Sequence, residues 1–195
     1  MAFMMPVSHL QLWAFFALSV VFFFFLVRAF SRRTGEAGTT RDSRSRLGIL
    51  LQSLGIGVAA VGRVKPILPS FSTAGLAGAS AVVLLMAGAI MLFAASSNAL
   101  GRNWSIVART RSDHELVQSG PYARVRHPIY LGLLLFLLGL AVAYGHWLQL
   151  VIAVPLYLAG TRIRTSIEDR LLESRFGDVF RDYRNSTPSL IPRLF

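Results

Sequence analysis

Residues 114–132 read His-Glu-Leu-Val-Gln-Ser-Gly-Pro-Tyr-Ala-Arg-Val-Arg-His-Pro-Ile-Tyr-Leu-Gly, a polar segment that runs directly into a long apolar block. Gly120-Pro121 indicates a turn. Pro128 suits the first turn of a helix, because the N–H that proline lacks would have no partner there. We therefore expect a membrane helix to begin at His127 or Pro128.

The start of that helix is a candidate site for an anion. Its free backbone N–H groups and the positive end of its dipole would lie beside Arg124, Arg126 and His127. Such a helix end favours the binding of a carboxylate or another anion. The segment is therefore predicted to form one half of a binding site.

The composition around this segment indicates an integral, multi-pass membrane protein. Of the 195 residues 54% are apolar and 15% charged, and the mean hydropathy is +0.55. The apolar residues form blocks, several of which approach the roughly 20 residues that cross about 30 Å of hydrocarbon. They predict an all-α, polytopic membrane helix bundle with about five transmembrane helices, at about Val7 to Phe30, Leu47 to Val61, Ala74 to Ala95, Pro128 to Tyr144 and Trp147 to Ala159.

The ends of these blocks refine the prediction. The first block lacks a basic n-region, so it is expected to be a retained helix and not a signal peptide. Only Gly145-His146 separates the last two blocks, which predicts a tight helical hairpin. After Gly160, apolar residues at three- to five-residue spacing predict an amphipathic C-terminal helix that ends near Gly177, followed by an irregular tail.

The basic residues predict the orientation. Eighteen lie in segments 28–46, 96–127 and 160–195, and two, Arg63 and Lys65, lie on the opposite side. The positive-inside rule then places the N-terminus outside and the C-terminal helix and the binding segment on the cytoplasmic face. A net charge of +11 distributed in this way indicates contact with membrane lipid and not with nucleic acid.

The C-terminal helix supplies a second polar segment on that face. Arg164 and Glu168 are four residues apart and share one side of a helix. Asp169, His127 and Arg126 should converge on them, so that a separated cation and anion could bind an anionic substrate and a zwitterion. The simpler interpretation is a surface ion pair that contributes under about 1 kcal/mol.

Other kinds of site find little support. The chain has no cysteine, which excludes disulfides and thiolate catalysis. Two histidines, His114 and His127, do not make a metal site without further ligands, so none is expected. His9 and His146 receive no role, and phosphate-binding glycine motifs are absent from the sequence.

Several motifs in order resemble the catalytic half of the isoprenylcysteine carboxyl methyltransferase family, which is related to phospholipid methyltransferases. They cover roughly residues 98–195, with Asp169 standing where the family has a second glutamate. The motifs are His114-x-Leu116-Val117, Gly120-x-Tyr122, Arg126-His127-Pro128-x-Tyr130-x-Gly132, Arg164-x-x-x-Glu168-Asp169, Leu171-Leu172 and Phe176-Gly177.

The resemblance implies a methyltransferase that binds S-adenosylmethionine. In it Glu168 receives the amino group of the cofactor, and Arg164 faces the methyl acceptor, a lipophilic or prenylated carboxylate. The cofactor contacts that it implies are His114, Glu115, Leu116, Val117, Tyr122, Arg126, His127, Pro128, Ile129, Tyr130 and Glu168.

Three alternatives stay open on the sequence. The acceptor could be a phospholipid amine or a thiol, or the protein could be a scaffold that binds anionic lipid without catalysis. An arginine at the acceptor favours a carboxylate, which is already ionised at neutral pH. Residues 1–95 are expected to form three packing helices along the acceptor path and residues 96–195 the catalytic half, and no feature indicates an oligomeric state.

Overall fold

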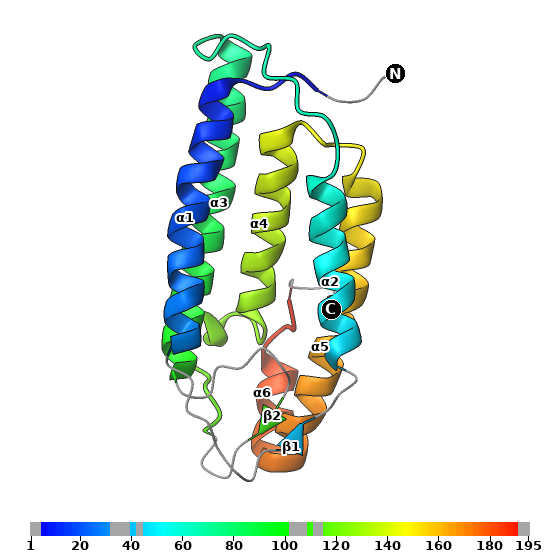
Figure 1. The fold of residues 1–195 in the computed structure, drawn as a ribbon. Helices are drawn as coiled ribbons and strands as arrows, with labels where there is room; N and C mark the ends of the chain where they lie inside the picture. The colour runs from blue at the N-terminus through cyan, green and yellow to red at the C-terminus, as the bar shows by residue number, and fades with distance from the viewer. Residues whose placement is uncertain (1–4, 32–39, 42–44, 102–108, 111–114, 191–195) are drawn as a thin grey trace.

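The computed structural model describes residues 5–31, 40–41, 45–101, 109–110 and 115–190, and these confirm an all-helical bundle. Figure 1 shows the long helices side by side and the short C-terminal helix at one end. At that same end, Thr40–Arg41 pairs in antiparallel fashion with Arg109–Thr110, which the sequence did not predict. The elements are α1 (His9–Ser31), β1 (Thr40–Arg41), α2 (Ser45–Ala60), α3 (Thr73–Leu100), β2 (Arg109–Thr110), η2 (Gly120–Ala123), α4 (Pro128–Tyr144), α5 (Leu150–Phe176) and α6 (Asp178–Ser186).

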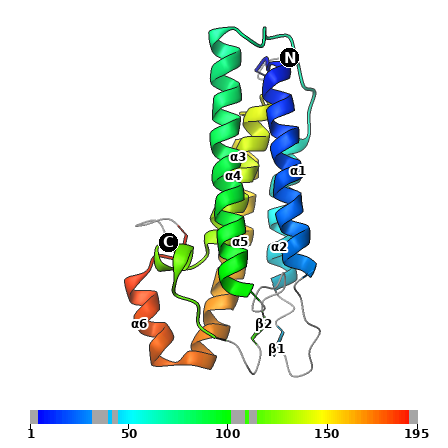
Figure 2. The ribbon, with the colours of Figure 1, turned by 90° about the vertical axis from the view of Figure 1, so that its left-hand side faces the viewer.

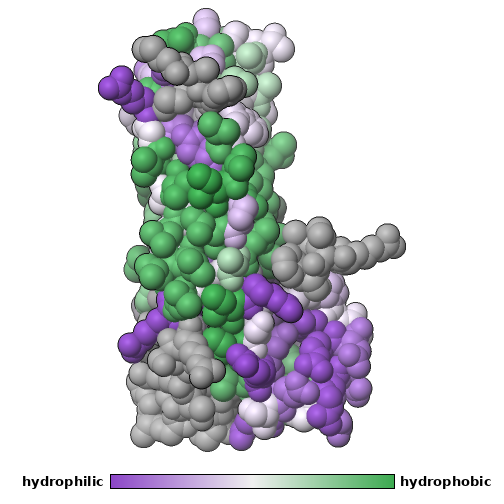
Figure 3. Space-filling model, turned by 90° about the vertical axis from the view of Figure 1, so that its right-hand side faces the viewer, coloured by the Kyte–Doolittle hydropathy of each residue, from purple (hydrophilic) through white to green (hydrophobic). Residues whose placement is uncertain are grey.

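The lengths of these helices identify a membrane protein. Helices α1, α3 and α5 are long and apolar enough to cross a membrane, and α2 and α4 are shorter apolar helices of 16 and 17 residues in the same bundle. Figure 3 shows a hydrophobic zone over the middle of one face and hydrophilic residues gathered at its lower end. The helical bundle satisfies the backbone hydrogen bonds internally, as a bilayer requires.

The bundle consists of two packed groups of helices. Helix α3 lies between α1 and α4, whereas α5 packs mainly along α2 and only lightly along α4. Aromatic side chains fill the first group, where the ring of Phe22 lies 5.1 Å from Phe93 and 4.9 Å from Phe136. The predicted tight hairpin of α4 and α5 is therefore splayed, because α5 finds a better packing partner in α2.

Glycines bring α2 and α5 into close contact. A Cβ added at Gly48 would lie 2.8 Å from the Gly160 carbonyl oxygen and 2.5 Å from Cγ of Arg164. A Cβ at Gly160 would lie 2.6 Å from the Gly48 carbonyl oxygen. Small residues allow such backbone approach between helices in lipid. The crossing places the first turn of α2 directly against the part of α5 that carries Arg164.

The chain after Gly160 differs from the sequence-based prediction. Helix α5 continues without interruption from the apolar residues into the charged ones, so the last membrane helix and the amphipathic helix are one element of 27 residues. It ends at Gly177, whose φ of +54° lies in the region that favours glycine. The tail that was predicted to be irregular folds into α6, which Figure 2 shows beside the lower end of the bundle, on the side away from α1.

The helix crossing generates a stability prediction with an internal control. Gly48→Ala should destabilise the fold by about 1–3 kcal/mol, because added atoms in a packed interface force the backbone to shift. Gly57→Ala, on the same helix, meets no atom within 4 Å and should leave stability unchanged or slightly raised. Thermal unfolding in one detergent measures both, and equal unfolding midpoints for the two variants would contradict the close crossing.

Candidate active site

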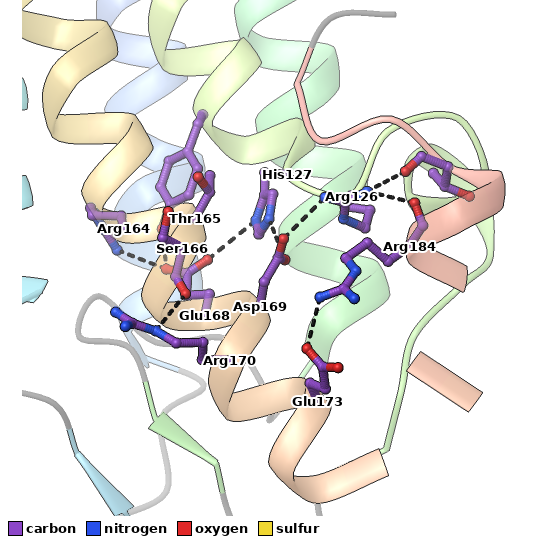
Figure 4. Close-up of polar contacts among 12 residues, drawn as sticks. Arg126, His127, Arg164, Thr165, Ser166, Glu168, Asp169, Arg170, Glu173 and Arg184 are labelled. Carbon is purple, nitrogen blue, oxygen red and sulfur yellow. Dashed lines mark hydrogen bonds and ion pairs between the residues drawn. The ribbon is translucent and has the colours of Figure 1, made fainter. Parts of the chain in front are cut away.

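Two polar segments far apart in sequence meet at the charged end of the bundle. The first is the turn η2 with the start of α4, where Pro128 occupies the first helical turn as the sequence predicted. The second is the charged part of α5. Figure 4 shows the side chains of His127, Glu168 and Asp169 directed toward one another between these two elements. The expected convergence of the two polar segments is therefore present in the structure.

Glu168 lies at the centre of this cluster. Its Oε1 accepts a hydrogen bond from the Tyr130 hydroxyl and lies 3.5 Å from Nη2 of Arg164. Its Oε2 lies 3.3 Å from Nδ1 of His127. The side chain keeps 24% of its surface exposed, so a carboxylate with several acceptor positions is both surrounded by donors and reachable from outside.

His127 joins two carboxylates at once. Its Nδ1 faces Glu168, and its Nε2 lies 2.9 Å from Oδ1 of Asp169. An imidazole donates from both nitrogens only when it is protonated. Burial alone would lower the pKa of His127, but the hydrogen bonds and negative charges of Asp169 and Glu168 outweigh burial and raise this pKa above its usual value. The two carboxylates therefore favour the protonated form of His127 between α4 and α5.

Arg126 connects Asp169 to the C-terminal segment. Its Nη2 donates to Oδ2 of Asp169 at 3.0 Å, and its Nη1 donates to the carbonyl oxygens of Arg184, at 3.0 Å, and Thr187. The backbone N–H groups of Arg126 and His127 donate to the carbonyl oxygens of Pro188 and Ser189, at 2.9 and 3.0 Å. The tail after α6 thus holds the start of α4 in place.

Arg164 forms the other side of the cluster. The residue is 7% exposed, and its Cζ lies 4.7 Å from the centre of the Tyr130 ring. Its Nη1 donates to Oε1 of Gln52 at 3.1 Å. The cation and the anion lie closer together than the separated arrangement considered from the sequence, because Arg164 and Glu168 form a direct ion pair.

The remaining predicted residues lie around the cluster or outside the described ranges. Glu115 is exposed, and Leu116 and Val117 are half-buried in the segment before η2. Tyr122 is buried in η2, and burial first and the charge of Glu168 second hold its pKa well above its usual value. Ile129 is half-buried in the first turn of α4, and His114 falls outside the described residues.

Two contributions escaped the sequence-based reasoning. The carbonyl groups of the C-terminal tail carry no residue-type signal, because any residue supplies a carbonyl. Gln52 does carry one, since an amide inside an apolar block of a membrane protein is costly and usually has a function. The sequence-based prediction nevertheless assigned Gln52 no role.

The electrostatics of His127 generate a pH prediction. Because its pKa is higher in the folded protein than the usual 6.5, the stability from its paired charge is fully present below pH 6.5 and is lost as the pH rises through the raised pKa. The thermal midpoint of the wild type should therefore fall toward that of His127→Asn as the pH increases. A gap between the two proteins that is constant from about pH 6 to pH 9 would contradict the charged pairing.

The sequence of the chain is similar to those of several known proteins. Residues 78–179 match the sequence profile of the family described as phospholipid methyltransferase. The chain is 37% identical over 94 residues to a protein-S-isoprenylcysteine O-methyltransferase of Schizosaccharomyces pombe, which confirms the expected resemblance; the match covers 47% of this chain and 40% of that protein.

Two bacterial proteins match at a similar level. The cobalt-zinc-cadmium resistance protein CzcN of Cupriavidus metallidurans is 38% identical over 99 residues, 49% of this chain and 44% of that protein. Methanethiol S-methyltransferase 2 of Bradyrhizobium diazoefficiens is 40% identical over 75 residues, 38% of this chain and 27% of that protein. The matched part thus spans less than half the length of each of these relatives.

The family match covers half of the chain and includes most of α3, all of α4 and α5, and every charged side chain of the cluster. The matched range therefore contains Arg126, His127, Arg164, Glu168 and Asp169. The chain belongs to the phospholipid methyltransferase family.

Proposed function

We propose that the protein is an integral membrane methyltransferase that transfers a methyl group from S-adenosylmethionine to a lipophilic acceptor, the carboxylate of an isoprenylcysteine-like molecule. The observation that carries this proposal is the Arg164–Glu168 ion pair, at 3.5 Å, at the point where α5 changes from apolar to charged. It combines a cation and an anion next to the apolar part of the same helix.

The residues of the cluster fit the chemistry of the cofactor. A carboxylate that is ionised and partly exposed suits the ammonium of an amino acid, and Oε2 of Glu168 has acceptor capacity beside His127. The N-terminus of α4, which begins at Pro128, carries the positive end of the helix dipole, and this favours the cofactor's carboxylate nearby. When bound, S-adenosylmethionine supplies a methyl group on a positively charged sulfur that departs as a neutral thioether, so no residue has to protonate the leaving group.

The protein's own task is then positioning. Arg164 presents a planar fork of donors that matches a carboxylate in two parallel hydrogen bonds. Glu168 and the residues around it hold the donor molecule, and the apolar bundle excludes water from the acceptor. Holding two reactants in line replaces much of the entropic barrier of a bimolecular reaction. No acid and base pair is needed for an acceptor that is already ionised.

The topology of the proposal follows the distribution of charge. Eighteen of the twenty basic residues lie in the sequence segments 28–46, 96–127 and 160–195, so we place the end of the bundle that carries the cluster on the cytoplasmic face and the N-terminus outside. Residues 96–195 form the catalytic half, and the first three helices line the acceptor path. Anionic lipid around the basic end would be attracted to the same face.

A thiol acceptor is the second candidate, because one relative is named a methanethiol S-methyltransferase. A thiol would need a base to remove its proton, whereas the residue proposed at the acceptor is an arginine. The two candidates differ in the stability of their products. Purified protein, labelled S-adenosylmethionine and a panel of prenylcysteine, aminolipid and thiol acceptors separate them.

The expected product is an ester. Mild base should release the label as methanol from a methyl ester, whereas N-methyl and S-methyl products keep it. Label that stays on the acceptor after base treatment would show that the acceptor is not a carboxylate. The assignment of the protein as a methyltransferase would still stand. Absence of transfer to every acceptor, together with no binding of S-adenosylhomocysteine, would instead favour the lipid-binding scaffold.

Substitutions separate the roles of the ion pair. Glu168→Gln should lower the affinity for S-adenosylhomocysteine by about tenfold to a hundredfold, since hydrogen bonds to charged groups contribute about 1.5–3 kcal/mol. Arg164→Ala should retain that affinity and lower turnover by at least about a hundredfold. Glu173→Gln is the control, because Glu173 pairs on the surface of α5 with Arg181 and Arg184. Calorimetry measures the affinity for S-adenosylhomocysteine, and an activity assay measures turnover. Normal methylation by Glu168→Gln and by Arg164→Ala would show that the site lies elsewhere.

A further inference from the structure

Gln52 is a polar side chain that α2 places inside the bundle. It is 4% exposed and lies between Gly48 and Gly55, the residues at which α2 approaches α5 most closely. A buried amide is costly unless its donors and its acceptor are both paired. The bonds that Gln52 makes therefore indicate why an amide occupies this position.

A chain of hydrogen bonds fixes which way the amide points. The Thr161 hydroxyl donates to the Tyr157 carbonyl oxygen at 2.9 Å, so its oxygen is left to accept. Gln52 donates to that oxygen through Nε2, also at 2.9 Å. The amide oxygen is then directed to Nη1 of Arg164, at 3.1 Å. A reversed amide would place the NH₂ donors of Gln52 against the N–H donors of Arg164.

Three helices together determine the position of the Arg164 guanidinium. Gln52 of α2 accepts from Nη1, Glu168 of α5 lies beside Nη2, and the ring of Tyr130 from α4 lies under Cζ. Arginine otherwise has a long side chain with many rotamers, whose ordering on substrate binding costs free energy. A guanidinium that is oriented beforehand avoids that cost.

The partner at position 52 is neutral, which has a consequence for charge. The amide oxygen orients Arg164 without adding a second negative charge to that of Glu168, which already pairs with Nη2, whereas a carboxylate at position 52 would compete with an anionic acceptor. Gln52 thus combines orientation with retention of charge. Gln52 lies one helical turn after Gly48. The close approach of α2 to α5 at Gly48 therefore brings the amide within reach of Arg164.

We infer that Gln52 is a positioning residue that holds Arg164 ready for an anionic acceptor, with Thr161 fixing the orientation of its amide. The inference rests on the proposed function, in which Arg164 contacts the acceptor carboxylate. It assigns part of the site to α2, in the half of the chain outside the family match at residues 78–179. The alternative is that Gln52 only stabilises the packing of α2 on α5.

The test uses the full-length protein and four substitutions. Gln52→Met keeps the length of the side chain and removes the amide, Gln52→Glu adds a negative charge beside Arg164, and Thr161→Val removes the hydroxyl. Thr165→Val is the matched control, because Thr165 is also buried on α5 but its hydroxyl donates to the Arg162 carbonyl oxygen. Each protein is assayed for turnover of a prenylcysteine acceptor and for binding of S-adenosylhomocysteine by calorimetry.

A positioning role predicts a split between the two readouts. Gln52→Met and Thr161→Val should lower kcat/KM for the acceptor by about tenfold or more, a size typical of a lost hydrogen bond to a charged group, while cofactor affinity changes less than about twofold. Gln52→Glu should raise the KM of the anionic acceptor most. Thr165→Val should resemble the wild type.

Other outcomes overturn the inference and leave the proposed function intact. If Gln52→Met and Thr161→Val behave like Thr165→Val, or if turnover and cofactor affinity fall in parallel, Gln52 only supports the fold. If the wild type neither binds S-adenosylhomocysteine nor methylates any acceptor, the proposed function fails. A double-mutant cycle of Gln52→Met with Arg164→Met in thermal unfolding then decides the contact, since additive shifts of the midpoint would show that the two side chains are not coupled.

Discussion

The bridge from His127 to Glu168 and Asp169 is the interaction on which the site depends. Helices α4 and α5 are consecutive in the chain but touch lightly along their lengths, so their charged ends need another connection. A protonated imidazole with a carboxylate on each nitrogen supplies it, at 3.3 and 2.9 Å. Buried charges are tolerated only when they are paired and hydrogen-bonded. The bridge therefore fixes the distance between the start of α4 and the charged part of α5, where Glu168 stays partly exposed.

The arrangement also explains how a membrane helix can end in a polar site. Helix α5 runs without interruption from lipid-facing residues to Arg164 and Glu168, so the acceptor side and the donor side of the proposed reaction are held on one rigid element. Across the cluster, Arg126, His127 and Arg164 face Glu168 and Asp169, three cations against two carboxylates. The excess of positive charge favours a net anionic occupant. The carboxylate acceptor is such an occupant, whereas the methyl donor carries an ammonium, a carboxylate and a sulfonium and relies on Glu168 to bind its ammonium.

Periodicity and composition predicted most of the bundle, since apolar block length and the position of Pro128 are local properties. The start of α4 at Pro128 and its end at Tyr144 agree with the structure. What failed depends on contacts between distant segments. The continuity of α5 beyond Gly160 follows from its packing against Gly48, and α6 forms because Phe180 and Tyr183 are buried and Arg126 binds carbonyl groups at its end. Gln52 had a local signal, an amide in an apolar block, but its partner Arg164 lies 112 residues away.

In the proposed function, His127 and Glu168 act as one unit in holding the methyl donor. A double-mutant cycle on the affinity for S-adenosylhomocysteine, with His127→Gln, Glu168→Gln and the double variant, measures this directly. The account predicts that each single substitution weakens binding and that the double variant binds no worse than Glu168→Gln alone, because His127 acts through the carboxylate that it orients. Losses that add independently, or single substitutions that leave the affinity unchanged, would contradict it.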